Sequence, residues 1–154
     1  MAFFIGLLSL TTSVWLINKF ILRKGAFQDF WAAGRWGIAI MFFQVGVMHL
    51  IKPEAFSYMI EGLIPYPNLM INLSGIAEII LGLGVLFPRT RKISAWLLIV
   101  MLVAIFPANI NVAVNDLASP GGLPSESWYR WSRLAFQPLY IFWVYRSVLF
   151  EVKE

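Results

Sequence analysis

The chain contains no cysteine, a single histidine and few charged residues. The absence of cysteine excludes a disulfide, a thiol relay and a thiolate metal site within this chain. One histidine without any thiolate is also a poor ligand set for a metal ion and cannot build a redox centre, so we expect neither. Charged residues make up 13% of the chain, against roughly 25% in a typical soluble domain. The composition therefore argues against a soluble domain.

The residues that are present suit a membrane protein. Of the 154 residues, 60% are hydrophobic, and the mean hydropathy is +0.75. The length suits one domain, 1–154. The net charge of +4 does not indicate nucleic-acid binding, because the basic residues lie at the ends of apolar runs and form no continuous patch. We expect the lipid bilayer as a partner, and no nucleic acid.

Apolar runs long enough to cross a bilayer recur along the chain. They predict an all-α fold, a polytopic membrane helical bundle. The predicted transmembrane segments are residues 2–22, 36–51, 69–87, 93–114 and 134–150. Residues 53–67 are too few to span and carry apolar residues at helical spacing, which predicts a short interfacial helix.

The basic residues are distributed unevenly between the two sides of this bundle. With the N-terminus outside, nine of the 12 lysine and arginine residues fall on the inner side, and the outer side carries Lys52, Arg130 and Arg133. Basic residues concentrate in cytoplasmic connections of membrane proteins. We therefore predict a multi-pass protein of the cell (inner) membrane, with its N-terminus outside and its C-terminus in the cytoplasm.

Glu78 lies in the middle of the apolar run from Leu69 to Phe87. A carboxylate at this depth costs roughly 2.5–3.5 kcal/mol on insertion scales, so it requires a partner, water or a proton. Ser74, Glu78 and Gly82 are spaced four residues apart and share one helix face. Small residues on that face allow a second helix to come close. Glu78 either serves a functional site inside the bundle or has only a structural role, in packing and hydrogen bonding between helices.

Other polar residues gather in the predicted outer half of the bundle. His49 ends the second segment, Asn109 lies near the outer end of the fourth, and Arg133 and Gln137 are one turn apart at the start of the fifth. We predict that His49, Glu78, Asn109, Arg133 and Gln137 form a ligand-binding site below an outer vestibule. In the plainer alternative, His49 is a capping or interfacial residue.

Pro107 lies inside the fourth segment. Its ring removes a backbone donor and frees the carbonyl of Val103, which predicts a kink. Within a bilayer the freed carbonyl needs a partner or water. The kink would also change the direction in which Asn109 points.

Several of these residues lie in motifs that resemble those of the DoxX-like family of small integral membrane proteins. The motifs are Gly46-Val47-Met48-His49, Ser74-Gly75-Ile76-Ala77-Glu78, Phe106-Pro107-Ala108-Asn109 and Arg133-Leu134-Ala135-Phe136-Gln137-Pro138. They occur in order between about Arg35 and Arg146. The resemblance implies a four-helix DoxX-like core, with the first segment packed as an additional N-terminal transmembrane helix. Leu50 departs from the family, where phenylalanine is usual.

The resemblance implies a link to membrane redox chemistry with quinone as acceptor. Our first hypothesis is an accessory or ligand-binding subunit, with a bound quinone or lipid as the candidate cofactor and a membrane redox or assembly protein as the candidate partner. A second is a membrane enzyme acting on a lipid-like substrate, with Glu78 and His49 as acid and base. A third is a non-catalytic assembly or chaperone subunit. We assign no catalytic residue.

The uneven basic charge generates a test of orientation. Reporter fusions placed after Lys24, Lys92 and Glu154 should report the cytoplasm, and a fusion after Gly122 should report the outside. A cytoplasmic signal at Gly122 would contradict the predicted topology.

Overall fold

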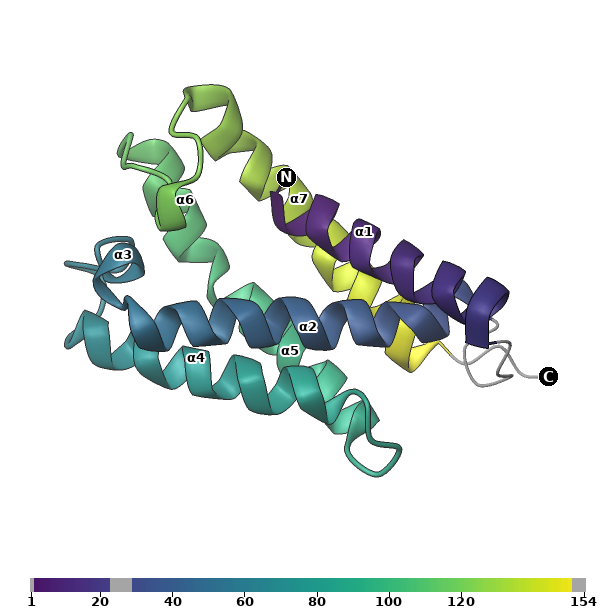
Figure 1. The fold of residues 1–154 in the computed structure, drawn as a ribbon. Coiled ribbons are helices and arrows are strands. Elements are labelled where there is room, and N and C mark those ends of the chain that lie inside the picture. Colours follow the sequence, from purple (N-terminus) through teal and green to yellow (C-terminus); the bar gives the residue numbers. More distant parts are fainter. Residues whose placement is uncertain (1, 23–28, 151–154) are drawn as a thin grey trace.

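A computed structural model describes residues 2–22 and 29–150, and every regular element in these ranges is a helix (Figure 1). In chain order the elements are α1 (Ala2–Ile17), η1 (Asn18–Leu22), α2 (Phe30–Ile51), α3 (Glu54–Ser57), α4 (Pro67–Gly84), α5 (Arg91–Ala104), α6 (Phe106–Val114), η3 (Pro120–Gly122), α7 (Ser127–Val144) and η4 (Tyr145–Leu149). The π-helical η1 and η4 extend α1 and α7. Arg23, Lys24 and Lys153, used in the topology prediction, lie outside the described residues.

Four helical stretches are long and apolar enough to cross a membrane. They are Ala2–Ile21, Phe30–Ile51, Pro67–Gly84 and Arg91–Val114. These stretches correspond to the first four predicted segments, and the predicted all-α class is confirmed for the described residues. The second helix begins before residue 36, directly after Asp29, whose backbone is extended. The third ends at Gly84, before residue 87, because the chain then turns toward α5.

The predicted fifth segment, 134–150, is not among these four stretches. The helix that contains this segment begins earlier, because α7 starts at Ser127, after the extended backbone of Glu126. This earlier start brings Arg130 and Arg133 into the helix. α7 therefore combines polar residues in its first half with an apolar second half, and hydropathy alone does not mark it as a span.

The short helix predicted within residues 53–67 is present as α3, Glu54–Ser57, and its place at a membrane interface stays a prediction. The helix α3 is only four residues long, and turns follow it. Gly62 and Tyr66 have positive φ angles of 78° and 55°, which interrupt a right-handed helix. Met59 and Ile60, which follow α3, are buried in a small cluster against α4 and α6.

The predicted kink in the fourth segment is confirmed. α5 ends at Ala104, and α6 begins at Phe106 with Pro107 in its first turn. Proline is tolerated at this position because the first N–H groups of a helix have no partner inside it. The break turns α6 away from the direction of α5 (Figure 1).

The long helices pack around α2. Figure 1 shows α4 antiparallel to α2 along its length, and these two helices form the most extensive contact, followed by α1 with α2. α7 contacts α1 through ring pairs such as Phe4 with Phe136, whose centroids lie 5.5 Å apart. α3 lies at one end of the bundle, and the turn between α4 and α5 lies at the other (Figure 1).

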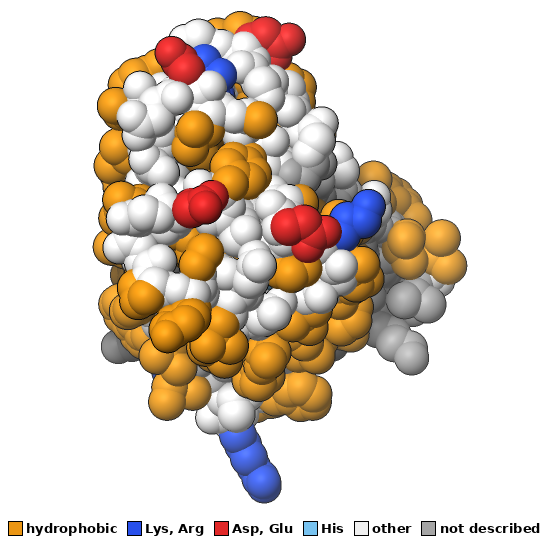
Figure 2. Space-filling model, turned by 90° about the vertical axis from the view of Figure 1, so that its left-hand side faces the viewer, with side chains coloured by type: hydrophobic (Ala, Val, Ile, Leu, Met, Phe, Trp, Pro, Cys, Tyr) orange, Lys and Arg blue, Asp and Glu red, His pale blue; other side chains and the backbone are white. Residues whose placement is uncertain are grey.

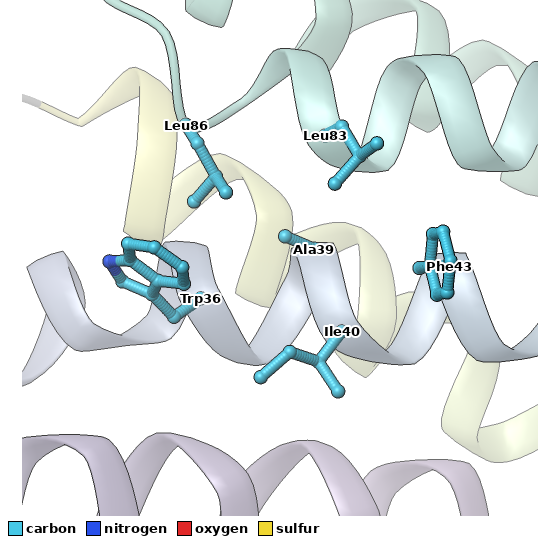
Figure 3. Close-up of a pocket in the computed structure, with 6 residues that line it drawn as sticks. All are labelled: Trp36, Ala39, Ile40, Phe43, Leu83 and Leu86. Carbon is cyan, nitrogen blue, oxygen red and sulfur yellow. The ribbon is translucent and has the colours of Figure 1, made fainter.

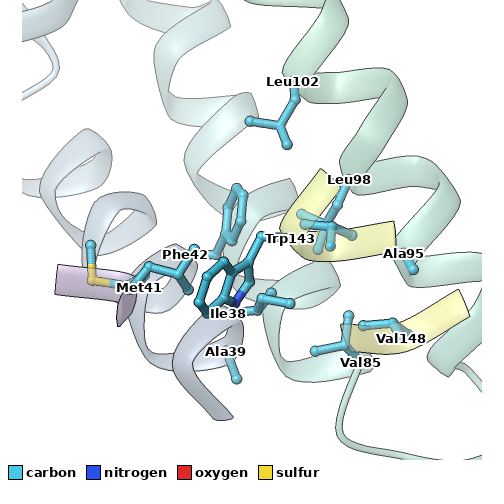
Figure 4. Packing of buried hydrophobic residues seen from close by; sticks show 12 residues of the cluster. Ile38, Ala39, Met41, Phe42, Val85, Ala95, Leu98, Leu102, Trp143 and Val148 are labelled. Carbon is cyan, nitrogen blue, oxygen red and sulfur yellow. The ribbon is translucent and has the colours of Figure 1, made fainter. Parts of the chain in front are cut away.

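The main hydrophobic core lies where α2, α5 and η4 meet beside the end of α4 (Figure 4). Ile38, Val85, Ala95 and Leu98 are fully buried there, and Trp143 lies among them. Burying one such side chain contributes roughly 1.5–3 kcal/mol in water. In a bilayer that gain is absent, and close van der Waals packing takes its place.

The outward faces of the long helices are strongly apolar. Ile80, Val100 and Phe142, from three different helices, are 63%, 60% and 53% exposed. Figure 2 views the molecule from the end that carries α3, where acidic and basic side chains are scattered among polar atoms while hydrophobic side chains cover much of the sides. Apolar surface of this extent suits a membrane or a large partner.

Two glycines allow α2 and α4 to touch at the backbone. A Cβ added at Gly46 would come within 2.5 Å of the Gly75 carbonyl oxygen, and one at Gly75 within 2.7 Å of the Gly46 carbonyl oxygen. Any larger residue at either position would push the helices apart. This close approach brings the residues near the C-terminal end of α2 against the first half of α4.

We expect Gly46→Ala to destabilise the protein by about 1–3 kcal/mol, because the new methyl group meets backbone that cannot yield locally. Thermal unfolding in mild detergent, followed by circular dichroism, measures this loss. Gly6→Ala is the matched control, since its Cβ would meet only the flexible end of Met41, at 3.0 Å from the sulfur. Equal stability of Gly46→Ala and the parent would contradict the proposed close contact.

Candidate functional site

Glu78 contacts His49 across the interface of α2 and α4. Glu78 is 3% exposed, and its Oε2 lies 2.9 Å from Nδ1 of His49. Each residue follows one of the paired glycines by three positions, so it lies on the same helix face as that glycine. A Cβ at Gly75 would come within 2.8 Å of the His49 Cβ, and one at Gly46 within 3.3 Å of the Glu78 Cβ. α2 therefore supplies the partner that a buried carboxylate requires.

The neighbours of the imidazole ring determine which nitrogen carries hydrogen. Ser74 Oγ lies 3.4 Å from Nδ1 of His49, and the Ser74 hydroxyl donates to the Ile71 carbonyl at 2.8 Å. A hydroxyl has only one hydrogen, so Ser74 can only accept from the ring, and an ionised Glu78 can also only accept. Oε2 is close to Nδ1 without being aligned as a good hydrogen bond. Nδ1–H thus lies between two acceptors.

The opposite ring nitrogen of His49, Nε2, remains available. It has no hydrogen bond within the described part of the chain and is not among the enclosed polar atoms. The His49 side chain is 12% exposed, compared with 4% for Glu78. The Phe56 ring packs edge-on against the imidazole at a centroid distance of 4.5 Å. The site therefore presents one oriented ring nitrogen, with a carboxylate behind it.

A second polar group joins α5, α6 and α7. Asn109 Nδ2 donates to Gln137 Oε1 at 3.2 Å, and Gln137 Nε2 donates to the Leu102 carbonyl at 2.6 Å. This carbonyl is one of the last four of α5, which have no partner within their own helix. The sequence predicted that Pro107 would free the Val103 carbonyl. The carbonyl that receives a side-chain donor is that of Leu102, because the whole helix ends at the break.

Arg133 belongs to the same group. Its Nη2 donates to Asn109 Oδ1 at 2.6 Å, so Asn109 is held from both sides by α7. The titratable groups that act on this guanidinium are Tyr58, Tyr129 and Tyr140, and no carboxylate is among them. The second group is therefore a buried amide pair with a cation at its edge.

The segment that begins with α3 contacts the first group and interacts electrostatically with the cation of the second. Phe56 packs on His49, and two residues later the Tyr58 hydroxyl donates to the Ala118 carbonyl at 2.6 Å. Burial raises the pKa of Tyr58, while the positive charge of Arg133 lowers it in part. The phenol therefore stays protonated as a donor. Sequence reasoning missed this role because the contacts join residues far apart in the chain.

The five predicted site residues fall into two groups. His49 and Glu78 form one, and Asn109, Arg133 and Gln137 form the other. Within residues 2–22 and 29–150, no hydrogen bond or ion pair joins the two groups. The single shared vestibule stays a prediction.

A pocket of about 250 Å³ lies elsewhere along α2, near the end of α4 (Figure 3). Its lining is entirely apolar and consists of Trp36, Ala39, Ile40, Phe43, Leu83 and Leu86. It extends toward the beginning of α2, whereas His49 lies near the end of that helix. As for metals, no cluster of three histidine, cysteine, aspartate or glutamate residues occurs in the described parts of the chain.

Comparison with known families places the chain in one of them. The family described as "Domain of unknown function (DUF8561)" matches residues 38–148, which is well over half of the chain, and the chain belongs to this family. The match includes all five predicted site residues and excludes α1. No curated protein and no solved structure matches the chain significantly.

The arrangement around Nδ1 predicts the tautomer of His49. This residue is the only histidine in the chain, so its imidazole nitrogen signals in NMR need no further assignment. In its neutral form we expect hydrogen on Nδ1 and none on Nε2, because Ser74 and Glu78 both accept at Nδ1. A neutral ring with hydrogen on Nε2 would contradict the contacts described above.

Proposed function

We propose that this chain is a multi-pass protein of the cell (inner) membrane that binds an apolar ligand bearing a carbonyl or hydroxyl group at His49. A quinone is the ligand that suits the site best. In this proposal the chain is an accessory, ligand-binding subunit for a membrane redox partner. The supporting observation is the His49–Glu78 pair, 2.9 Å apart, with the second ring nitrogen unoccupied by protein.

The membrane location rests on the surface and on the charge distribution. Four helices have the length and apolar composition of spans, and apolar side chains cover their outward faces. The basic residues favour an outside N-terminus and a cytoplasmic C-terminus. In that orientation His49 and α3 lie in the outer half. The motif resemblance to DoxX-like proteins supports the same proposal.

The pair has the donors and acceptors that a quinone requires. Nε2–H of a protonated His49 would donate to a quinone carbonyl oxygen, and the hydroxyl of the reduced form would donate to Nε2 of a neutral ring. Glu78 carries the compensating charge while the ring is protonated, so the pair can hold one proton without leaving an isolated charge in an apolar setting. Electrons would come from the partner, because this chain contributes no thiolate and one histidine only.

The same pair also suits the second hypothesis, an enzyme that acts on a lipid-like substrate. A carboxylate and an imidazole within 2.9 Å form an acid–base pair that can move a proton to or from a substrate at Nε2. The two proposals differ in what the site does to its ligand. A quinone is retained unchanged by this chain alone, whereas a substrate is converted by it.

Purification in mild detergent, followed by extraction and mass spectrometry of bound small molecules, tests the proposal. We expect the parent protein to retain a quinone. Both His49→Phe and Glu78→Gln should retain roughly tenfold less, since a hydrogen bond to a charged group contributes about 1.5–3 kcal/mol. Conversion of an added lipid by the purified chain alone would favour the enzyme instead.

Gln44→Ala is the matched control. Gln44 is exposed on the same helix as His49, so this variant also removes a polar side chain from α2 without touching Glu78. It should retain quinone as the parent does. Absence of quinone from the parent protein, or equal retention by all variants, would contradict the proposal.

A further inference from the structure

Arg133 carries a positive charge that has no counter-charge among the residues the structure describes. A guanidinium has five N–H donors, and the single hydrogen bond that Arg133 makes in the described structure is from Nη2 to Asn109, a neutral amide. Its Nη1 is enclosed and has no hydrogen-bond partner. The residue as a whole is half-buried, so it lies at the boundary between the protein and its surroundings.

Arg130, one turn earlier on α7, differs from Arg133 because its charge is paired. Its Nη2 contacts the carboxylate of Asp116, and its Nη1 donates to the carbonyls of Asp116 and Leu117 at 3.3 and 3.4 Å. The Nε of Arg130 also lacks a partner, but its charge is matched. Arg130 therefore links α7 to the connection between α6 and α7, whereas Arg133 makes no contact with an acid within residues 2–22 and 29–150.

The described surroundings of Arg133 are polar and contain no competing acid. Tyr58, Tyr129 and Tyr140 are the titratable groups that act on it. Tyr58, from the α3 segment, interacts with it electrostatically, and Asn109, from α6, accepts its hydrogen bond. A cation surrounded by neutral polar side chains attracts an anion more strongly than one in water, because the local dielectric constant is lower.

We propose that the guanidinium of Arg133 is a binding site for a phosphate group, at the end of the bundle that carries α3. Arginine suits this role because its planar fork matches the oxygens of a phosphate. The phosphate belongs either to the head group of an anionic phospholipid or to a free phosphate ion. This site uses none of the atoms of the His49–Glu78 pair and extends beyond the proposed quinone site.

The test uses the full chain in neutral detergent with two probes, phosphatidylglycerol and inorganic phosphate. Phosphatidylglycerol is offered together with an equal amount of phosphatidylcholine, and the bound lipids are counted by native mass spectrometry. We expect the parent to prefer phosphatidylglycerol by about tenfold, as one charge-assisted contact allows. Displacement of this lipid by millimolar phosphate identifies the free ion as the ligand, and resistance to phosphate identifies the lipid head group.

Three variants locate the site. Arg133→Gln should abolish the preference for phosphatidylglycerol, and Arg133→Lys should keep part of it, because it retains the charge and loses the fork. Arg130→Gln is the matched control on the same helix and should keep the preference. Loss of equal size in Arg130→Gln and Arg133→Gln would overturn the site, because general surface charge would then explain the binding.

Measurements on the parent protein alone test the proposal even if Arg133→Gln does not fold. Equal binding of the two lipids together with no effect of phosphate on thermal unfolding would overturn it. Glu78→Gln separates this site from the quinone site, since it should lose quinone and keep the preference for phosphatidylglycerol. A folded Arg133→Gln that still prefers phosphatidylglycerol would also refute the role of Arg133.

Discussion

The backbone contact between Gly46 on α2 and Gly75 on α4 determines where the chemistry of this protein lies. With a Cβ at either position, the carbonyl oxygen of the other glycine would be about 2.5–2.7 Å away, which is closer than van der Waals packing permits. Because both helices approach this closely, the residues three positions further on, His49 and Glu78, meet at 2.9 Å. A wider spacing would leave the Glu78 carboxylate buried without this partner.

The helix break at Ile105 has a comparable effect on the other side of the bundle. Ending α5 there leaves its last carbonyls without helical partners, and the amide of Gln137 binds one of them, that of Leu102. The restart at Phe106 directs Asn109 toward α7, where it joins Gln137 and Arg133. An interruption of the backbone thus becomes an anchoring point for a side-chain network.

The two polar groups differ in their charge balance, and this difference bears on the ligands that each could bind. The His49–Glu78 pair contains both a base and its counter-charge, so a proton can move within it while the net charge stays constant. The Asn109–Gln137–Arg133 group contains a cation without an acid among the described residues. The first group is therefore suited to a neutral ligand with exchangeable hydrogen, and the second to an anion. The segment from Phe56 to Tyr58 packs on the first group and feels the charge of the second.

The sequence by itself determined the helical class, the first four apolar stretches, the break before Pro107 and the identity of the buried carboxylate, because hydropathy, proline and isolated charge act locally. It did not determine the start of α7, since residues 127–133 mix arginine and serine with aromatic residues and lie in a helix that contacts α6 and the connection between α6 and α7. It also did not determine that the hydrogen bonds and close contacts of the five polar residues divide them into two groups. Only the tertiary structure decided which helices meet at glycines, and therefore that His49 faces Glu78 while Arg133 faces Asn109. Contacts of this kind depend on the relative rotation and spacing of helices, which local sequence patterns do not specify.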